Sequence, residues 1–129
     1  MSQSILESTK LALGVSVDQH AFDSMLTMHI NSVLADLTQL GVGPQTGFEI
    51  QTDAEVWSDF LGVNKPELNQ VKSYVYLRVR MLFDPPDIGF VLTAMKEQID
   101  KFEWKINVLV DHEILRDPPT PLAPTQEVL

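Results

Sequence analysis

Three groups of residues could do chemistry, and each also has a purely structural explanation. The run Asp111–Glu113 holds an aspartate, a histidine and a glutamate, but adjacent side chains on a helix do not converge on one site. His20 and Asp23, with Asp18 nearby, could hold a divalent cation, although helix capping and the acidic preference of a first turn explain both carboxylates. His29 lies among regularly spaced apolar residues, where a hydrogen-bonded histidine of the core or of an interface is expected.

The sequence carries no motif of a catalytic or cofactor site. Gly41–Pro44 (GVGP) lacks the Gly-Lys-Ser/Thr ending of a phosphate-binding loop, and neither a His-Glu-x-x-His pattern nor a nucleophile elbow occurs. There is no cysteine, which excludes disulfides, thiolate metal sites and a cysteine nucleophile. We therefore predict a non-catalytic protein without a metal or a cofactor.

Tyrosines and arginines alternate in the stretch YVYLRVR. These residues are Tyr74, Tyr76, Arg78 and Arg80. Such a cluster could bind nucleic acid, so a helical nucleic-acid-binding or DNA-packaging accessory protein is the alternative function. Two arginines are few for that purpose, and ion pairing at a contact between subunits explains them better. The two tryptophans, Trp57 and Trp104, are predicted to anchor the core or such a contact, because large aromatic surfaces contribute most there.

The chain is acidic, and its first half holds most of the excess. The formal net charge is −9; residues 1–63 contain eight acidic residues and one lysine, and residues 64–129 contain ten acidic and eight basic residues. Tight DNA binding depends on lysine and arginine contacts to phosphates, so this balance argues against DNA as a tight partner and is compatible with repelling it. The acidic residues that we expect at a channel or an exposed rim are Asp18, Asp23, Asp36, Asp53, Glu55 and Asp59.

Length and composition predict one globular domain. A chain of 129 residues suffices for one core but hardly for two, and 44% hydrophobic with 21% charged residues is ordinary for a folded protein. No run of roughly 18 apolar residues occurs, and the N-terminus lacks the regions of a signal peptide. We expect no membrane span and synthesis in the cytoplasm.

Hydrophobic periodicity predicts an all-α fold, a small bundle of about five helices. In the first helix Ser4 and Glu7 form a capping box, and Gly14 ends the helix. Asp18 is the predicted N-cap of a second helix of about 20 residues, which Gly41 stops.

A loop with a brief extended piece at Phe48–Ile50 follows this second helix. Thr52 and Glu55 then form a second capping box before a short helix that ends at Gly62.

The stretch from Asn64 to Pro85 is ambiguous between helix and strand. A period of two would align Val75, Leu77, Val79 and Met81, as in a strand. Asn64 as N-cap, Pro66 in the first turn and Glu67 are typical of a helix start. Apolar residues then follow at helical spacing, at Leu68, Val71, Val75, Val79 and Leu82. We predict a helix.

The last predicted helix runs from Ile88 to Leu109. Its apolar face consists of Ile88, Leu92, Met95, Ile99, Phe102, Ile106 and Leu109. From Leu115 onward four prolines exclude a helix and favour an extended arm. The predicted division is a helical domain over residues 1–114 and a proline-rich arm over residues 115–129.

Two long stretches carry a resemblance to a known family. LTMHINSVLADLTQLGVGP and VKSYVYLRVRMLFDPPDIGFVLTAMKEQIDKFEWKINVLVD, joined by WSDFLG, look like the phage head-tail connector (adaptor) proteins of long-tailed bacteriophages. With the first helix the resemblance covers roughly residues 4–112, and it lies in the layout of helices because the family has no active site.

This resemblance implies a structural protein of the virion neck, assembled in the host cytoplasm. About a dozen copies would form a ring on the portal protein, extend the DNA channel and offer a platform for a downstream stopper or tail terminator. The acidic residues would face passing DNA, and Tyr74, Tyr76, Arg78, Arg80 and Trp104 would lie between subunits. The arm would reach into the portal, and its expected contacts are Leu115, Pro118, Pro119, Pro121, Leu122, Val128 and Leu129.

Overall fold

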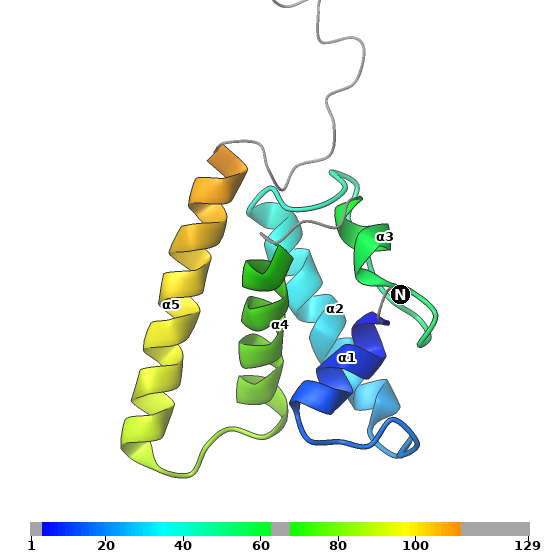
Figure 1. Ribbon diagram of the computed structural model, residues 1–129, viewed down its shortest axis with the longest axis vertical. Helices are drawn as coiled ribbons and strands as arrows, with labels where there is room; N and C mark the ends of the chain where they lie inside the picture. The colour runs from blue at the N-terminus through cyan, green and yellow to red at the C-terminus, as the bar shows by residue number, and fades with distance from the viewer. Residues whose placement is uncertain (1–3, 63–67, 112–129) are drawn as a thin grey trace, which may run out of the picture.

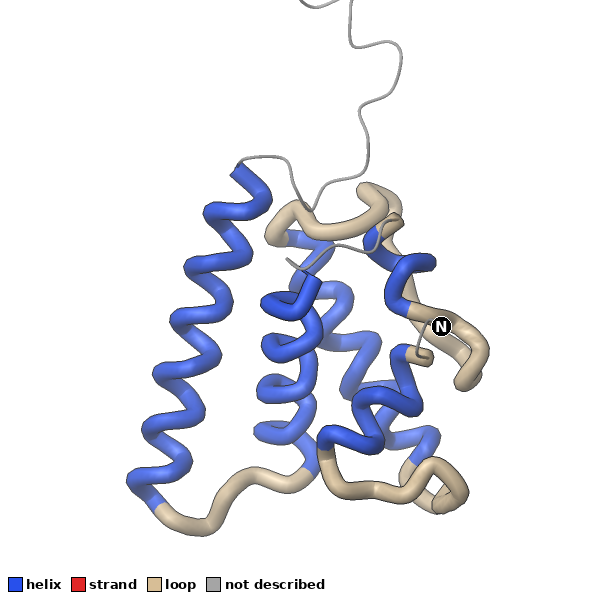
Figure 2. The backbone as a smooth tube through the Cα atoms, in the orientation of Figure 1, coloured by secondary structure: helices blue, strands red, loops and turns tan. Residues whose placement is uncertain are grey.

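The computed structural model describes residues 4–62 and 68–111, and over these residues the chain is helical and contains no strand (Figures 1 and 2). The helices are α1 (Ile5–Ala12), α2 (Asp23–Gln39), α3 (Trp57–Leu61), α4 (Leu68–Phe83) and α5 (Gly89–Asp111). The predicted all-α bundle is confirmed. The proline-rich arm and the predicted cap at Asn64 lie outside the described residues.

Helix α4 is the centre of the bundle. It packs against α2 and α1 on one side and against α5 on the other, so that α5 forms an outer layer (Figure 1). The ambiguous stretch is thus a helix, as predicted, because Val71, Val75 and Val79 all enter the core at helical spacing.

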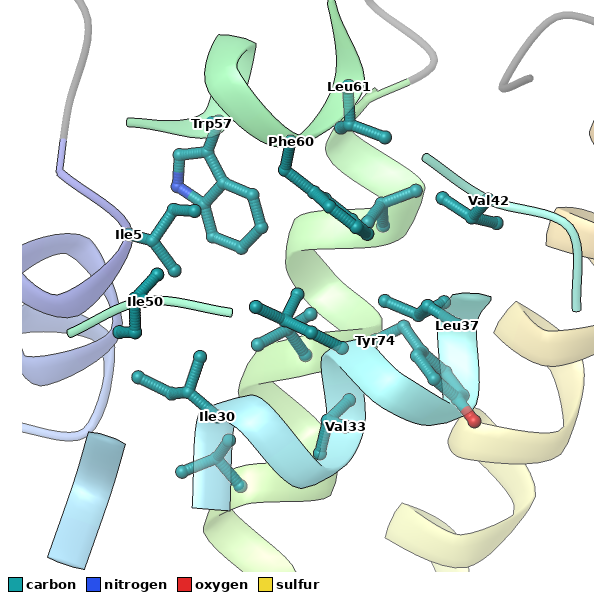
Figure 3. Packing of buried hydrophobic residues seen from close by; sticks show 14 of the residues in the cluster. Ile5, Ile30, Val33, Leu37, Val42, Ile50, Trp57, Phe60, Leu61 and Tyr74 are labelled. Carbon is teal, nitrogen blue, oxygen red and sulfur yellow. The ribbon is translucent and has the colours of Figure 1, made fainter. Parts of the chain in front are cut away.

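The core is built from α1, α2, α3, α4 and the loop between α2 and α3 (Figure 3), and α5 adds Ile106 and Val110 to it. Tyr74 and Phe60 are among its largest buried side chains. Gly43 lies directly against Phe60: a Cβ at this position would come within 2.6 Å of a carbon of the ring, and its φ of +79° is also one that side chains disfavour. Here only glycine lets the loop cover the aromatic ring.

Glycines end α1 and α2 in the way the sequence predicts. Gly14 and Gly41 have φ values of +80° and +97°. After α1 the amide of Val15 donates to the carbonyl of Lys10 at 2.8 Å, and after α2 the amide of Val42 donates to that of Leu37 at 2.9 Å. These are the six-to-one hydrogen bonds of Schellman caps, and they satisfy carbonyls that the helix leaves open.

Helix α2 begins four residues later than predicted, with its N-cap at Phe22 instead of Asp18. Asp18 lies in an exposed turn, and the first helical residue is Asp23. The buried ammonium of Lys10 in α1 explains the delay: its Nζ donates to the carbonyls of Val17 at 3.2 Å and Gln19 at 2.6 Å, and to Asp23 Oδ1 at 2.7 Å. The carbonyl of Gln19, which a helix begun at Asp18 would direct along its axis, points at Lys10 instead.

The second predicted capping box closes a loop instead of starting α3. Glu55 Oε1 accepts from the amide and the hydroxyl of Thr52, and Glu55 Oε2 accepts from the amide of Gln51. Against the cost of burial, hydrogen bonds from these backbone amides hold the pKa of Glu55 below its usual value. At α3 itself Asp59 accepts from the amide of Val56 at 2.9 Å, and Gly62 ends the helix with a φ of +80°.

The piece at Phe48–Ile50 finds a side chain as its partner, so it forms no strand. The side chain of Asn31 in α2 makes both bonds: Nδ2 donates to the carbonyl of Ile50 at 2.9 Å, and Oδ1 accepts from the backbone N–H of Ile50 at 2.8 Å. Both backbone groups of the buried Ile50 are therefore satisfied without a neighbouring strand.

Helix α5 is amphipathic, but only part of its predicted apolar face is covered. Ile106 is fully buried and Ile99, Phe102 and Leu109 pack against the core, whereas Ile88 is 56% exposed. A single helix, α4, provides most of its contacts, so the face that turns away from α4 has no neighbour within the described chain.

Candidate functional site

A hydrogen-bonded network joins the three long helices around Tyr74. Its hydroxyl donates to Glu103 Oε2 of α5 at 2.8 Å and accepts from Arg78 Nη1 at 2.7 Å. Arg78 Nη2 in turn forms an ion pair with Asp36 Oδ2 of α2 at 2.7 Å. Burial and the hydrogen bond to Glu103 raise the pKa of Tyr74, and the partners of Arg78 outweigh its burial and raise its pKa. The phenol and the guanidinium therefore keep their protons, and the network fixes α2, α4 and α5 together.

This network changes how the predicted interface residues can act. Tyr74 is fully buried, so its ring belongs to the core of its own subunit. Arg78 is already paired within the chain, which leaves little of it for nucleic acid or for a second subunit. Tyr76 and Arg80 are half-buried, and Arg80 donates to the carbonyl of Asp84 at 3.2 Å. Of the predicted set, Trp104 is the most open, with 67% of its surface exposed on α5.

Trp104 borders a shallow groove between the start of α4 and the last turns of α5. The groove has a volume of about 220 Å³ and is lined by Gln70, Trp104, Lys105, Val108 and Leu109. By contrast, Trp57 is buried, and its Nε1 donates to Ser8 Oγ at 2.9 Å. One tryptophan is thus a core anchor and the other is available to a partner.

The predicted acidic residues do not form one surface. Asp36 is paired with Arg78, Asp23 with Lys10, and Asp59 caps α3. Glu55 holds the loop before α3. The side chains of Asp18 and Asp53 are exposed in loops, and no hydrogen bond or ion pair engages their carboxylates in the part of the chain that the structure describes.

The candidate cation site at His20 and Asp23 is occupied by the protein's own groups. Asp23 Oδ1 binds Lys10 and Asp23 Oδ2 lies 2.8 Å from His20 Nδ1. The hydrogen bonds from Lys10 and His20 lower the pKa of Asp23. Residues 4–62 and 68–111 contain no group of three histidine or carboxylate side chains that could hold a metal ion.

The structure gives the remaining candidate residues from the sequence ordinary structural positions. His29 is half-buried on α2, and Asp111 is exposed at the end of α5, while the rest of the run 111–113 lies outside the described residues. Gly41–Pro44 is the stop of α2 and the cover of Phe60. No described helix is long and apolar enough to cross a membrane.

Two features were missed by reasoning from the sequence. The first is the buried Lys10, whose only signal was that it is the single lysine of the first 63 residues. The second is a group of large hydrophobic side chains that are exposed at helix ends, such as Phe22, Leu82 and Phe90. Periodicity marks such residues as apolar but does not tell which of them the fold leaves uncovered.

The comparisons with known proteins identify a family. The family model described as phage connector protein matches residues 5–113, nearly the span over which the resemblance was predicted. No curated protein and no solved structure matches the chain.

Proposed function

The chain belongs to the phage connector protein family, and on that premise we propose that it forms a ring beneath the portal, extends the DNA channel and joins the capsid to the neck and tail. A connector is a structural component of the virion, and its work is to hold neighbours in place. We propose that the chain has no catalytic activity.

The observation that carries the ring proposal is the one-sided packing of α5. A closed ring needs two different contact faces on each subunit. The flank of α5 with the exposed Trp104, together with the groove between α5 and Gln70 of α4, offers one such face. The opposite flank, formed by α1, α3 and the start of α2, offers the second (Figure 1).

The acidic balance supports a conduit that DNA passes without tight binding. Asp18 and Asp53 leave their carboxylates to solvent, and the Arg78 guanidinium is neutralised within the subunit. We expect no gel shift of duplex DNA at low salt. A sub-micromolar affinity that falls steeply with added salt would favour the nucleic-acid-binding alternative.

We propose that residues 1–114 are the ring-forming domain and that residues 115–129 are an arm that docks on the portal. The prolines pre-extend the chain and reduce the entropy lost on binding, and Leu115, Leu122, Val128 and Leu129 offer spaced apolar anchors. Truncation after Arg116 should leave helical content unchanged and abolish binding to the portal. Normal yields of infectious particles with the truncated chain would refute the docking role.

The ring itself is tested by electron microscopy and light scattering of the purified protein, alone and mixed with its portal. Trp104→Ala should raise the concentration needed for ring formation roughly tenfold or more, since it removes an exposed aromatic anchor. Glu97→Ala, a change at an exposed polar position of the same helix, is the matched control. A chain that stays monomeric at high concentration and also ignores the portal would refute the proposal.

A further inference from the structure

Most of the exposed large hydrophobic side chains gather at one end of the bundle. Of eight such side chains among the described residues, six lie there, and they are between 40% and 77% exposed. We call this surface the apolar end; it consists of Leu11, Phe22, Met25, Leu82, Ile88 and Phe90. They occupy the last turns of α1 and α4, the starts of α2 and α5 and the loop before α5, which meet at the lower end of Figure 1. A gathered apolar surface of this kind marks a contact site.

The apolar end is held in a fixed shape. The rings of Phe22 and Phe83 meet edge to face with centroids 5.3 Å apart, which ties the start of α2 to the end of α4. Lys10 holds the loop before α2 through two carbonyls and Asp23. A surface that is already ordered loses little entropy when a partner binds.

The charges around the apolar end are mainly negative. Asp18, Asp84 and Asp87 are exposed in the two loops of this end. His20 is also exposed but is held by Asp23, and Arg80 is half-buried and directed at the carbonyl of Asp84. An apolar centre with a polar rim is the usual anatomy of a protein contact, and a negative rim favours a positive partner.

The opposite end of the bundle has a different character. It carries the loop after α2, with the polar and exposed Gln45 and Thr46, and none of the six side chains of the apolar end lies on it. Asp111, where the described part of the chain stops before the arm, also lies at this opposite end (Figure 1). The described part of the chain therefore ends on the side that faces away from the apolar end.

We propose that the apolar end is the docking surface for the structural protein that follows the connector on its tail side. The contact surface of this partner presents apolar side chains bordered by lysines or arginines. The assignment of the apolar end to the tail side rests on the proposed function. If the arm binds the portal from the opposite end of the bundle, the apolar end faces the tail.

The test uses the full chain and the purified neck and tail proteins of the same phage, mixed with it one at a time. The variant Ile88→Ser/Phe90→Ser removes apolar surface, and Asp84→Lys/Asp87→Lys reverses the rim; both pairs are exposed, so circular dichroism should show an unchanged fold. Glu97→Ala, a change at an exposed polar position of the same helix outside the apolar end, is the matched control. We expect each double variant to weaken binding of one neck protein roughly tenfold or more, with ring formation and portal binding intact.

Three other outcomes would each overturn the assignment. Loss of self-association would make the apolar end a contact between copies of this chain, and loss of portal binding alone would turn it toward the head. Unchanged affinity for every neck protein would show that no such partner docks there. A failure of the proposed function looks different, since the unaltered chain would then form no ring and bind no portal.

Discussion

The replacement of Lys10 by methionine tests whether one buried ammonium organises an end of the bundle. Lys10 is 1% exposed, and its ammonium is bound by two carbonyls of the loop before α2 and by the carboxylate of Asp23. Methionine keeps most of the apolar stem but removes every donor. The carbonyls of Val17 and Gln19 then lose their partner, and Asp23 keeps only His20.

The expected loss of stability follows from these three hydrogen bonds. A charged hydrogen bond contributes about 1.5–3 kcal/mol, and the two bonds to carbonyls add to it. Returning the ammonium to water in the unfolded state offsets part of this sum, because burial of a charge is costly. We therefore expect Lys10→Met to lower the free energy of unfolding by about 2–3 kcal/mol.

Urea unfolding followed by circular dichroism measures the effect. Lys72→Met is the matched control: Lys72 is half-buried, and its ammonium lies 5.9 Å from the centre of the Trp57 ring, a contact that contributes about 0.5 kcal/mol. Asp23→Asn should be nearly as harmful as Lys10→Met, and the double variant should lose less than the sum of both, because the two side chains form one pair. Equal small losses for Lys10→Met and Lys72→Met would refute the reasoning.

Three further predictions rest on single contacts. Tyr74→Phe should cost about 1–1.5 kcal/mol because Glu103 and Arg78 lose a partner, whereas Tyr76→Phe at a half-buried site should cost less than about 0.5 kcal/mol, both by urea unfolding. The pKa of Asp23 is lower in the folded than in the unfolded chain, so its carboxylate stabilises the fold fully above the unfolded pKa and loses this effect as the pH falls through the folded pKa. Between about pH 5 and pH 2, the urea midpoint should therefore fall less in Asp23→Asn than in the unaltered chain. Gly43→Ala should cost at least about 2 kcal/mol and Gly14→Ala about 1 kcal/mol in thermal unfolding, because both have positive φ but only the Gly43 Cβ would meet Phe60; equal costs would exclude the clash.

Local signals allowed most helix ends to be predicted. Gly14, Gly41 and Gly62 end helices because they adopt positive φ, and Ser4 accepts from the amide of Glu7 at 3.1 Å. These interactions lie within a few residues of each other, so their pattern is readable in the chain. The helical spacing of the valines in α4 similarly outweighed their strand propensity.

The errors came from partners that are distant in sequence. Asp18 has the residue type of an N-cap, but Lys10 holds the following loop and moves the start of α2 to Asp23. The network that joins α2, α4 and α5 through Tyr74, Arg78 and Glu103 was also not predicted. The exposure of Leu82 and the partial burial of Phe83 one residue later likewise depend on where Phe22 packs. None of these contacts follows from spacing along one helix.

The position of α5 as an outer layer also decides the order in which the subunit opens. If α5 detaches from α4, it uncovers Ile106, Val110 and one side of Tyr74, while the contacts between α1, α2 and α4 can stay closed. Its amide hydrogens should therefore exchange with solvent through a partial opening, and those of α2 only through global unfolding. A neighbouring subunit that binds the outer face of α5 would slow amide hydrogen exchange most in α5, because this helix is the least protected one in the free subunit. In the assembled ring, α5 and the rest of the subunit would then unfold as one cooperative unit, whereas in the free subunit α5 can open alone.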